Sequence, residues 1–483
     1  MAGNTFFWHD YETFGRDPRR DWPAQFAGVR TDEQLNEIEP PVVHFCRPPR
    51  DRLPDPGSCL ITGITPQRCE HEGLPEHAFA AAVQAQLGRA GTVGVGYNTI
   101  RFDDEFTRFL LWRNLADPYA REWRDGCGRW DLMDVVRTAW ALRPEGLQWP
   151  VKEDGRPSFR LQDLTAANGL EHAAAHDAMS DVGATLALAR LVRTAQPRLW
   201  EHGLSMRLKS NVQAALAPGK PVLHISGRYP TERGCMAVVV PLATHPGNRN
   251  EVILWDLAQD PTELMSLSAA EIRERLFTPR EALEAAGKTR LPVKTLHLNK
   301  SPIVVSSLKV LTPERAERWG LDTALALRHA ERAREVVGPM AGVWSEVYAR
   351  PVAAGEEPPD VDGDLYGAFV PDDDRAGLQR LRALPPAELA HARPAFGDAR
   401  LAELLWRYRA RNFPETLSDE ERLRWQAHCH ERLHGGAAGV TTLAKWMEEV
   451  DTLAEQADEQ ADERGQAVLA ELVDWAEAIA PEA

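Results

Sequence analysis

Strand-like and helical runs alternate along the first 200 residues, and this alternation limits the possible folds more than any other feature of the sequence. Residues 5–14 (TFFWHDYETF) and 91–98 (GTVGVGYN) have the composition of strands, whereas 102–115 and 177–197 have helical periodicity. We expect the apolar stripes of both helices to be buried, the first against a sheet; they are Phe102, Phe106, Phe109 and Leu110, then Val182, Leu186, Ala189 and Val192. Residues 1–200 are therefore predicted to form an α/β domain with a mainly parallel or mixed sheet.

The composition and the hydrophobic pattern of the sequence change twice after this domain. From residue 221, short apolar runs are separated by turn residues such as HPGNRN (245–250), which is typical of a small β-barrel or curled sheet with helical insertions. An acidic link, AAGEEPPDVDGD (353–364), is expected to be loose. Beyond it almost every run is helical, so residues 365–483 are predicted to form a helical bundle or a helical arm across the other domains.

Charge is unevenly distributed along the 483 residues. The formal net charge of −16 divides into −5 for residues 1–200, +4 for 201–350 and −15 for 351–483. The middle part is thus basic enough to face a polyanion or an acidic peptide, although the whole chain is acidic. The sequence contains no apolar run of the ~20 residues that a membrane helix needs, no signal-peptide pattern and no C-x-x-C pair. These features predict a cytoplasmic protein without a membrane partner, whose six cysteines are reduced.

Two carboxylates stand at alternate positions in the first strand. Side chains alternate along a strand, so Asp10 and Glu12 are expected on one face, about 7 Å apart. A divalent cation between them would offset their repulsion, and carboxylate ligands suit magnesium or manganese. The alternative is a pair on an edge strand facing water.

Two further motifs lie where helices begin. Asp103 follows the strand-like GTVGVGYN, and Asp181 stands five residues after His176 at the start of the second helix. Both acids could instead simply favour a helix N-terminus, worth ~0.3–1 kcal/mol each. The pair His176-Asp177 also occurs in metal-dependent phosphohydrolases, but no other histidine lies at supporting spacing on a helix.

In this order the motifs resemble those of the DEDD exonuclease superfamily, in the subgroup with histidine in the last motif. Blocks from residue 6 to about 418 resemble bacterial exodeoxyribonuclease I within it, among them GYNTIRFDDEFTR, RWDLMDVVR, HPGNRN, PVKTLHLNKSP and YRARNFPETL. The resemblance implies a ribonuclease H-like α/β exonuclease domain (1–200), an SH3-like β-barrel domain (201–355) and an all-α C-terminal domain (356–483). It also implies a monomeric 3′ to 5′ exodeoxyribonuclease that releases 5′-mononucleotides from single-stranded DNA in DNA repair and recombination.

The same resemblance implies roles for individual residues. It makes His176 the general base and assigns two Mg²⁺ ions, replaceable by Mn²⁺, to Asp10, Glu12, Asp103 and Asp181. Glu12 would also contact the reacting group. The implied strand contacts are Arg160, Arg108, Tyr119, Trp123 and Arg137, and Arg143 is the matching contact for the acidic tail of the single-stranded DNA-binding protein.

Alternatives remain open from sequence alone. The catalytic set does not distinguish deoxyribose from ribose, so a 3′ to 5′ RNA exonuclease is one rival. A non-catalytic single-stranded DNA-binding scaffold is another, although such proteins usually lose a metal ligand and this chain keeps all four. Arg407, Arg409 and Arg411 either line a DNA channel or form salt bridges between domains.

Overall fold

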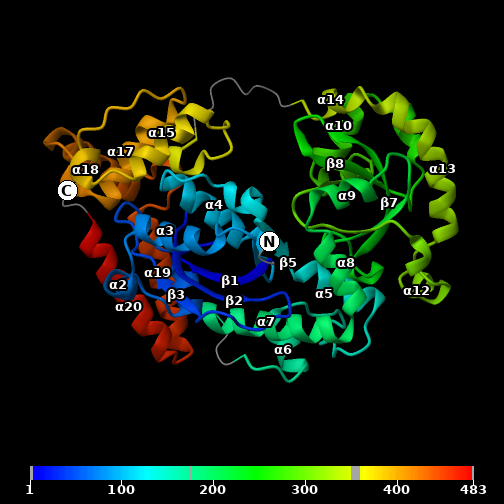
Figure 1. The fold of residues 1–483 in the computed structure, drawn as a ribbon, viewed down its shortest axis with the longest axis horizontal. Helices are drawn as coiled ribbons and strands as arrows, with labels where there is room; N and C mark the ends of the chain where they lie inside the picture. Colours follow the sequence, from blue (N-terminus) through cyan, green and yellow to red (C-terminus); the bar gives the residue numbers. More distant parts are fainter. Residues whose placement is uncertain (1–3, 173–175, 350–358, 481–483) are drawn as a thin grey trace. The chain divides into compact units, whose positions relative to one another are not determined.

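The computed structural model describes residues 4–172, 176–349 and 359–480, which fall into two compact units (Figure 1). The first unit comprises Met1–Gly128, His172–Gly183 and Glu357–Ala483, and the second comprises Arg129–Glu171 and Ala184–Glu356. The first unit is therefore assembled from both ends of the chain and a short piece of its middle.

A twisted sheet and many helices make up the first unit. Its sheet strands are β1 (Thr5–Thr13), β2 (Pro23–Thr31), β3 (Val42–Phe45), β4 (Thr92–Gly96) and, starting at its boundary, β5 (Gly128–Asp131). Its helices before the second unit are α1 (Pro56–Thr62), α2 (Pro66–Glu72), α3 (Glu76–Leu87), α4 (Asp103–Arg113) and the first residues of α7 (Ala178–Ala195). After the second unit follow α15 (Asp372–Arg382), α16 (Pro386–Leu389), α17 (Arg400–Asn412), α18 (Asp419–His430), α19 (Leu443–Glu459) and α20 (Glu463–Ile479).

The sheet is mixed, as predicted. The strand order is β3-β2-β1-β4-β5; β1 runs antiparallel to β2 and parallel to β4, with Trp8 opposite Val29 and Val95. Strand β1 is thus interior, which excludes the alternative that Asp10 and Glu12 lie on an edge strand. Alternate residues of β1 enter an aromatic core, in which Tyr11 lies 4.8 Å from Phe26 between ring centroids.

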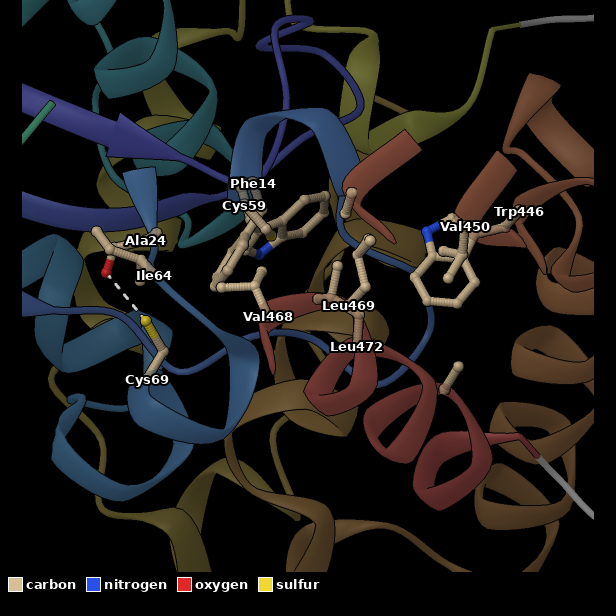
Figure 2. Packing of buried hydrophobic residues seen from close by; sticks show 13 residues of the cluster. Phe14, Ala24, Cys59, Ile64, Cys69, Trp446, Val450, Val468, Leu469 and Leu472 are labelled. Carbon is tan, nitrogen blue, oxygen red and sulfur yellow. Dashed lines mark hydrogen bonds between the residues drawn. The ribbon is translucent and has the colours of Figure 1, made fainter. Parts of the chain in front are cut away.

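The C-terminal helices share hydrophobic cores with the N-terminal part of this unit. Figure 2 shows Trp446 and Val450 of α19 and Leu469 of α20 in one cluster with Phe14 and Cys59. A second cluster joins Phe109 and Trp112 of α4 to α15 and α17. Phe109 was expected to face the sheet, and that prediction is wrong because α4 is buried on several sides. Leu110, one residue later, does pack with the sheet residues.

Buried arginines and aspartates connect the same parts of the chain. Asp362, fully buried, accepts hydrogen bonds from Arg407 (2.9 Å), Arg411 (2.6 Å), Arg432 (3.2 Å) and Arg52 (3.3 Å). Arg411 also pairs with Asp51 of the N-terminal domain at 2.9 Å, so the predicted salt bridge between domains is observed for this arginine. Arg407 and Arg409 are paired within the C-terminal domain, Arg407 with Asp362 and Arg409 with Glu421 at 2.7 Å.

Asp362 also corrects the expectation of a loose acidic link. Residues 353–358 of that link lie outside the described residues. The rest is ordered, because Val361–Gly363 forms a 3₁₀ turn and Trp112 donates a 2.8 Å hydrogen bond to the Val361 carbonyl. The acidic composition of the link did not predict this order, because the arginines that neutralise the aspartates of the link are distant in sequence.

The second unit contains an antiparallel sheet with helical insertions, as expected. Its strands β6 (Val222–Ile225), β7 (Met236–His245), β8 (Asn248–Asp256), β9 (Val293–His297) and β10 (Ile303–Val305) are ordered β10-β6-β7-β8-β9. The HPGNRN turn joins β7 to β8. Its helices are α5 (Met133–Leu142), α6 (Leu161–Ala167), the rest of α7, α8 (Pro197–Ser205), α9 (Lys209–Ala215), α10 (Ala269–Phe277), α11 (Arg280–Ala285), α12 (Pro313–Arg318), α13 (Thr323–Met340) and α14 (Val343–Val347).

The predicted burial of one face of α7 is also confirmed. The stripe of α7 is buried at Val182, Leu186, Ala189 and Val192, and the helix ends before Pro197. The six cysteines all fall within the described residues and are free thiols. Among the described residues, no helix has both the length and the apolarity needed to cross a membrane.

Candidate active site

Strand β1 supplies the first two carboxylates of the site. His9 and Tyr11 point into the aromatic core, so the residues that alternate with them, Asp10 and Glu12, share the other face. Burial keeps the His9 ring neutral, because it lowers the pKa of that imidazole to about 4. His9 is therefore excluded as a base that gains a proton at neutral pH.

Asp103 joins them from the start of α4. Its side chain is 3% exposed, and Oδ1 accepts a 3.0 Å hydrogen bond from the backbone N–H of Tyr11, between the two strand carboxylates. Thr107, one turn along α4, reaches both the Asp103 carbonyl (2.8 Å) and the Tyr11 hydroxyl (3.0 Å). The neighbouring Asp104 has a different partner, Arg121 at 2.6 Å. The helix thus directs one of two adjacent aspartates toward β1 and the other into an ion pair.

The first turn of α7 supplies the fourth carboxylate. Asp177 begins this helix by accepting the Ser180 backbone N–H at 3.0 Å, and Gln25 of β2 accepts the Ala178 backbone N–H at 3.2 Å. Gln25 lies directly opposite Glu12 in the sheet register. These bonds fix the start of α7 beside β1 and β2, and Asp181 follows in that turn.

His176 stands just before α7, at the site. Glu12, His176 and Asp181 each offer one possible ligand atom, and these three atoms lie within 4.8 Å of one another. The His176 side chain is exposed, and its backbone has φ of +65°, a left-handed conformation that is uncommon for a residue with a side chain. Such strain often accompanies function, and here it brings an imidazole beside two carboxylates.

The carboxylates perturb one another strongly. Burial, followed by the charges of Asp103, Glu12 and Asp181, raises the pKa of Asp10 well above its usual value. Burial and the nearby charges of Asp181 and Asp177 raise the pKa of Glu12 from 4.5 to about 8. Burial also raises the pKa of Asp181. Buried like charges of this kind fit a bound divalent cation, because carboxylate oxygens are ligands that hard divalent cations prefer.

The metal-free protein should therefore lose stability as pH rises from about 5 through 8. A group with a raised pKa in the folded state favours folding at low pH, and this contribution, of order a few kcal/mol for Glu12, is lost as pH rises through the folded pKa. Thermal unfolding in EDTA across this range should show the decline, and Mg²⁺ should remove it. Glu12→Gln should flatten the EDTA profile; an unchanged slope would contradict the assignment of the effect to Glu12.

The predicted strand contacts in the first unit differ in exposure. Trp123 is 64% exposed and lies in stacking range of Arg124, at 5.5 Å. Arg108 is 6% exposed and donates to both carboxylate oxygens of Glu122 at 2.7 and 2.9 Å. Its guanidinium also lies 5.3 Å from the centre of the half-buried Tyr119 ring. Trp123 is thus open for stacking, whereas Arg108 already has a carboxylate partner.

The other predicted contacts lie in the second unit. Arg160 is exposed just before α6, whereas Arg137 pairs with Asp134 at 2.6 Å. Arg143 follows α5 and donates to the Leu142 carbonyl at 2.6 Å; burial and the charge of Arg315 lower its pKa.

The basic middle part also contains a cavity of about 550 Å³ beside β8 and β9. Its lining combines cations and rings with one carboxylate and includes Arg228, Arg290, Lys294, His245, Phe277, Tyr348 and Glu251. This composition suits a nucleic-acid strand, since rings stack bases and cations meet phosphates.

The sequence motifs did not reveal every residue of the site. Gln25, Asp177 and His172 hold its elements in place, and His172 Nε2 lies 2.5 Å from Asp181 Oδ1. The N-cap rule predicts Asp177, because it precedes the helix and accepts the Ser180 N–H three residues on. Gln25 and His172 follow no such rule, because their partners are set by the tertiary fold.

Three family models match successive parts of the chain. They describe an exonuclease (residues 7–189), an exonuclease I SH3-like domain (207–350) and an exonuclease I C-terminal domain (359–479). The chain is 45% identical to exodeoxyribonuclease I of Escherichia coli strain K12 over 433 residues, which cover 88% of this chain and 89% of that protein.

Solved structures agree over almost the whole length. Exonuclease I from Methylocaldum szegediense, 46% identical, matches with a TM-score of 0.93 and covers 99% of this chain and 100% of its own. E. coli exonuclease I in complex with a dA16 oligonucleotide, 42% identical, gives 0.92 with the same coverage. Related structures include an E. coli exonuclease I–single-stranded DNA complex with zinc and an SSB/exonuclease I complex with an inhibitor, at TM-scores of 0.89 and 0.88.

Proposed function

Because the chain belongs to the exodeoxyribonuclease I family, we propose that it hydrolyses single-stranded DNA from the 3′ end and releases 5′-mononucleotides. It is an exonuclease whose relatives have been solved with single-stranded DNA. The observation that carries the proposal is the approach of Asp10, Glu12, Asp103, Asp181 and His176 to one another in one folded unit.

Electrostatic repulsion opposes phosphodiester hydrolysis, because an oxygen nucleophile must attack an anionic phosphate. Two divalent cations, when bound by the four carboxylates, supply electrostatic stabilisation of the phosphate and of the leaving 3′ oxygen. We assign both positions to Mg²⁺, with Mn²⁺ as a substitute. A zinc-containing relative supports binding of a divalent metal by this family.

His176 carries out the proton transfer, and Glu12 orients the attacking water. His176 is exposed, so its ring can accept a proton from the attacking water and pass it to solvent. Glu12, held in β1, orients that water. The left-handed backbone of His176 keeps its ring beside Glu12 rather than in the helix that follows.

Strand binding is assigned to residues of both units. Trp123 has the exposure to stack a base, at ~1–3 kcal/mol, and exposed Arg160 can pair with phosphate. Tyr119 offers a second ring, and Arg108 and Arg137, each ion-paired in the free protein, must exchange carboxylate for phosphate to take part. The cavity at β8 and β9 provides further cations and rings.

A protein partner is also proposed. An SSB/exonuclease I complex is known for a relative, and we assign the acidic SSB tail to Arg143, whose neighbour Arg315 adds positive charge. The setting that we propose is a monomer acting in the cytoplasm during DNA repair and recombination.

The proposal is tested by nucleotide release from 5′-labelled single-stranded DNA in Mg²⁺, beside RNA of the same sequence and DNA blocked at its 3′ end. Release from unblocked DNA alone, abolished by Asp181→Ala, is the expected result. Equal hydrolysis of RNA would favour an RNA exonuclease, and binding without release would favour the scaffold alternative.

A further inference from the structure

His172 lies against the candidate metal ligand Asp181, although no motif singles it out. Its Nε2 is 2.5 Å from Asp181 Oδ1, and the two side chains are 8% and 19% exposed. The same carboxylate accepts a hydrogen bond from the backbone N–H of His176. Asp181 is therefore held by two groups from the segment that precedes its own helix.

The two histidines of this segment are arranged differently. The His176 ring is exposed and offers a nitrogen within 4.8 Å of ligand atoms of Glu12 and Asp181. The His172 ring is buried, and its Nε2 contacts one oxygen of Asp181. Burial strengthens a hydrogen bond of this kind, because water does not compete for the carboxylate. His176 is thus placed to face a bound metal or substrate, whereas His172 is placed to hold the candidate metal ligand Asp181.

A carboxylate on the first turn of a helix can rotate about two side-chain bonds. A hydrogen bond to one oxygen fixes the direction of the other, and outer partners of this kind orient metal ligands throughout metalloproteins. We propose that His172 is a positioning residue, which holds Asp181 Oδ1 through its Nε2–H so that the remaining oxygen faces the metal. This inference rests on the proposed metal-dependent function.

A purely structural role would give a different outcome, in which His172 only ties the segment to α7. In that case its loss would lower stability without changing metal affinity. Glutamine separates the two roles, because its side-chain amide nitrogen can donate from a similar reach without the imidazole ring.

The experiment is a Mn²⁺ titration of the full chain without DNA, with free Mn²⁺ followed by electron paramagnetic resonance. His172→Ala is expected to weaken binding about 10- to 100-fold, the usual effect of removing an outer partner. His172→Gln should stay within about threefold of wild type. His71→Ala, which removes an exposed histidine of α2, is the matched control and should bind as wild type does.

Asp181→Ala distinguishes the two ways in which the inference can fail. If this variant loses Mn²⁺ and His172→Ala does not, the positioning role is overturned while the metal site stands. If Asp181→Ala binds Mn²⁺ as tightly as wild type, the proposed metal site itself is wrong. Weak binding by His172→Gln, equal to that of His172→Ala at wild-type thermal stability, would overturn the donor role.

A second readout uses hydrolysis of single-stranded DNA as a function of Mg²⁺. His172→Ala should shift the Mg²⁺ concentration for half-maximal activity upward by the factor found for Mn²⁺, with most of the maximal rate recovered at high Mg²⁺. A wild-type Mg²⁺ dependence with a reduced maximal rate would overturn the inference.

Discussion

Asp10→Asn is expected to abolish DNA hydrolysis and at the same time to stabilise the metal-free protein. Asparagine keeps the size of the side chain and removes its negative charge. In the absence of metal, burial, followed by the charges of Asp103, Glu12 and Asp181, raises the pKa of Asp10 well above its usual value, so the folded protein must either take up a proton here or hold an unfavourable charge. Asp10→Asn should therefore avoid this cost, whereas catalysis loses a proposed metal ligand and should fall at least about a thousandfold, or ~4 kcal/mol.

The two effects are measured on the same samples. Nucleotide release in Mg²⁺ should drop for Asp10→Asn, while its unfolding temperature in EDTA should rise above that of wild type. Mg²⁺ should raise the unfolding temperature of wild type more than that of the variant. Glu72→Gln, which neutralises a half-exposed carboxylate of α2 paired with Arg68, is the control for a simple change of net charge. Retention of activity by Asp10→Asn would remove this residue from the metal site.

Of all these substitutions, Asp362→Ala is expected to lower the free energy of unfolding the most. This carboxylate is fully buried and contacts four arginines, among which Arg411 and Arg432 are themselves almost completely buried. Arg411 and the other arginines hold the pKa of Asp362 well below its usual value even though burial opposes ionisation. Removing one partner of a buried ion pair costs ~3–5 kcal/mol, because the opposite charges stay buried without compensation.

Urea unfolding followed by tryptophan fluorescence measures this loss. Trp22 and Trp425 lie over Arg411, at 5.1 and 5.6 Å, so their emission reports on this region. Asp372→Ala serves as the control, because that aspartate is 87% exposed at the start of α15, where it pairs with Arg375 on the surface. An unfolding midpoint for Asp362→Ala equal to that of the control would contradict a stabilising role for the buried cluster.

The candidate site was predictable where its residues belong to local patterns. Asp10 and Glu12 were placed on one strand face by alternation alone, and Asp103 and Asp181 by their positions at helix starts. His172 was not predictable, because its nine-residue separation from Asp181 matches no helical or strand period, and their contact is tertiary. Local periodicity describes single elements, and it contains no information on how loops return to them.

Prediction of the fold from the sequence meets the same limit. The strands of the second unit and the stripe of α7 follow from composition and period, and both were predicted. The failure at Phe109 has a tertiary cause, since α4 packs against the C-terminal helices as well as near the sheet. Asp362 was read as part of a solvated link for a related reason. Its neutralising arginines come from residues 52, 407, 411 and 432, and no window of neighbouring sequence contains them.

The discontinuity of the first unit has a consequence for synthesis on the ribosome. Phe14 and Trp22 emerge before the second unit is made, yet their cluster includes Trp446, Leu469 and Leu472, which are translated after it. The nuclease portion therefore waits in an incomplete state, with apolar surface uncovered, while the second unit is made between its halves. Emergence of α19 and α20, rather than completion of the candidate site at residue 181, is then the event that ends exposure to chaperones and proteases. A stop codon late in the gene should accordingly be as damaging to the N-terminal domain as to the helices that it removes.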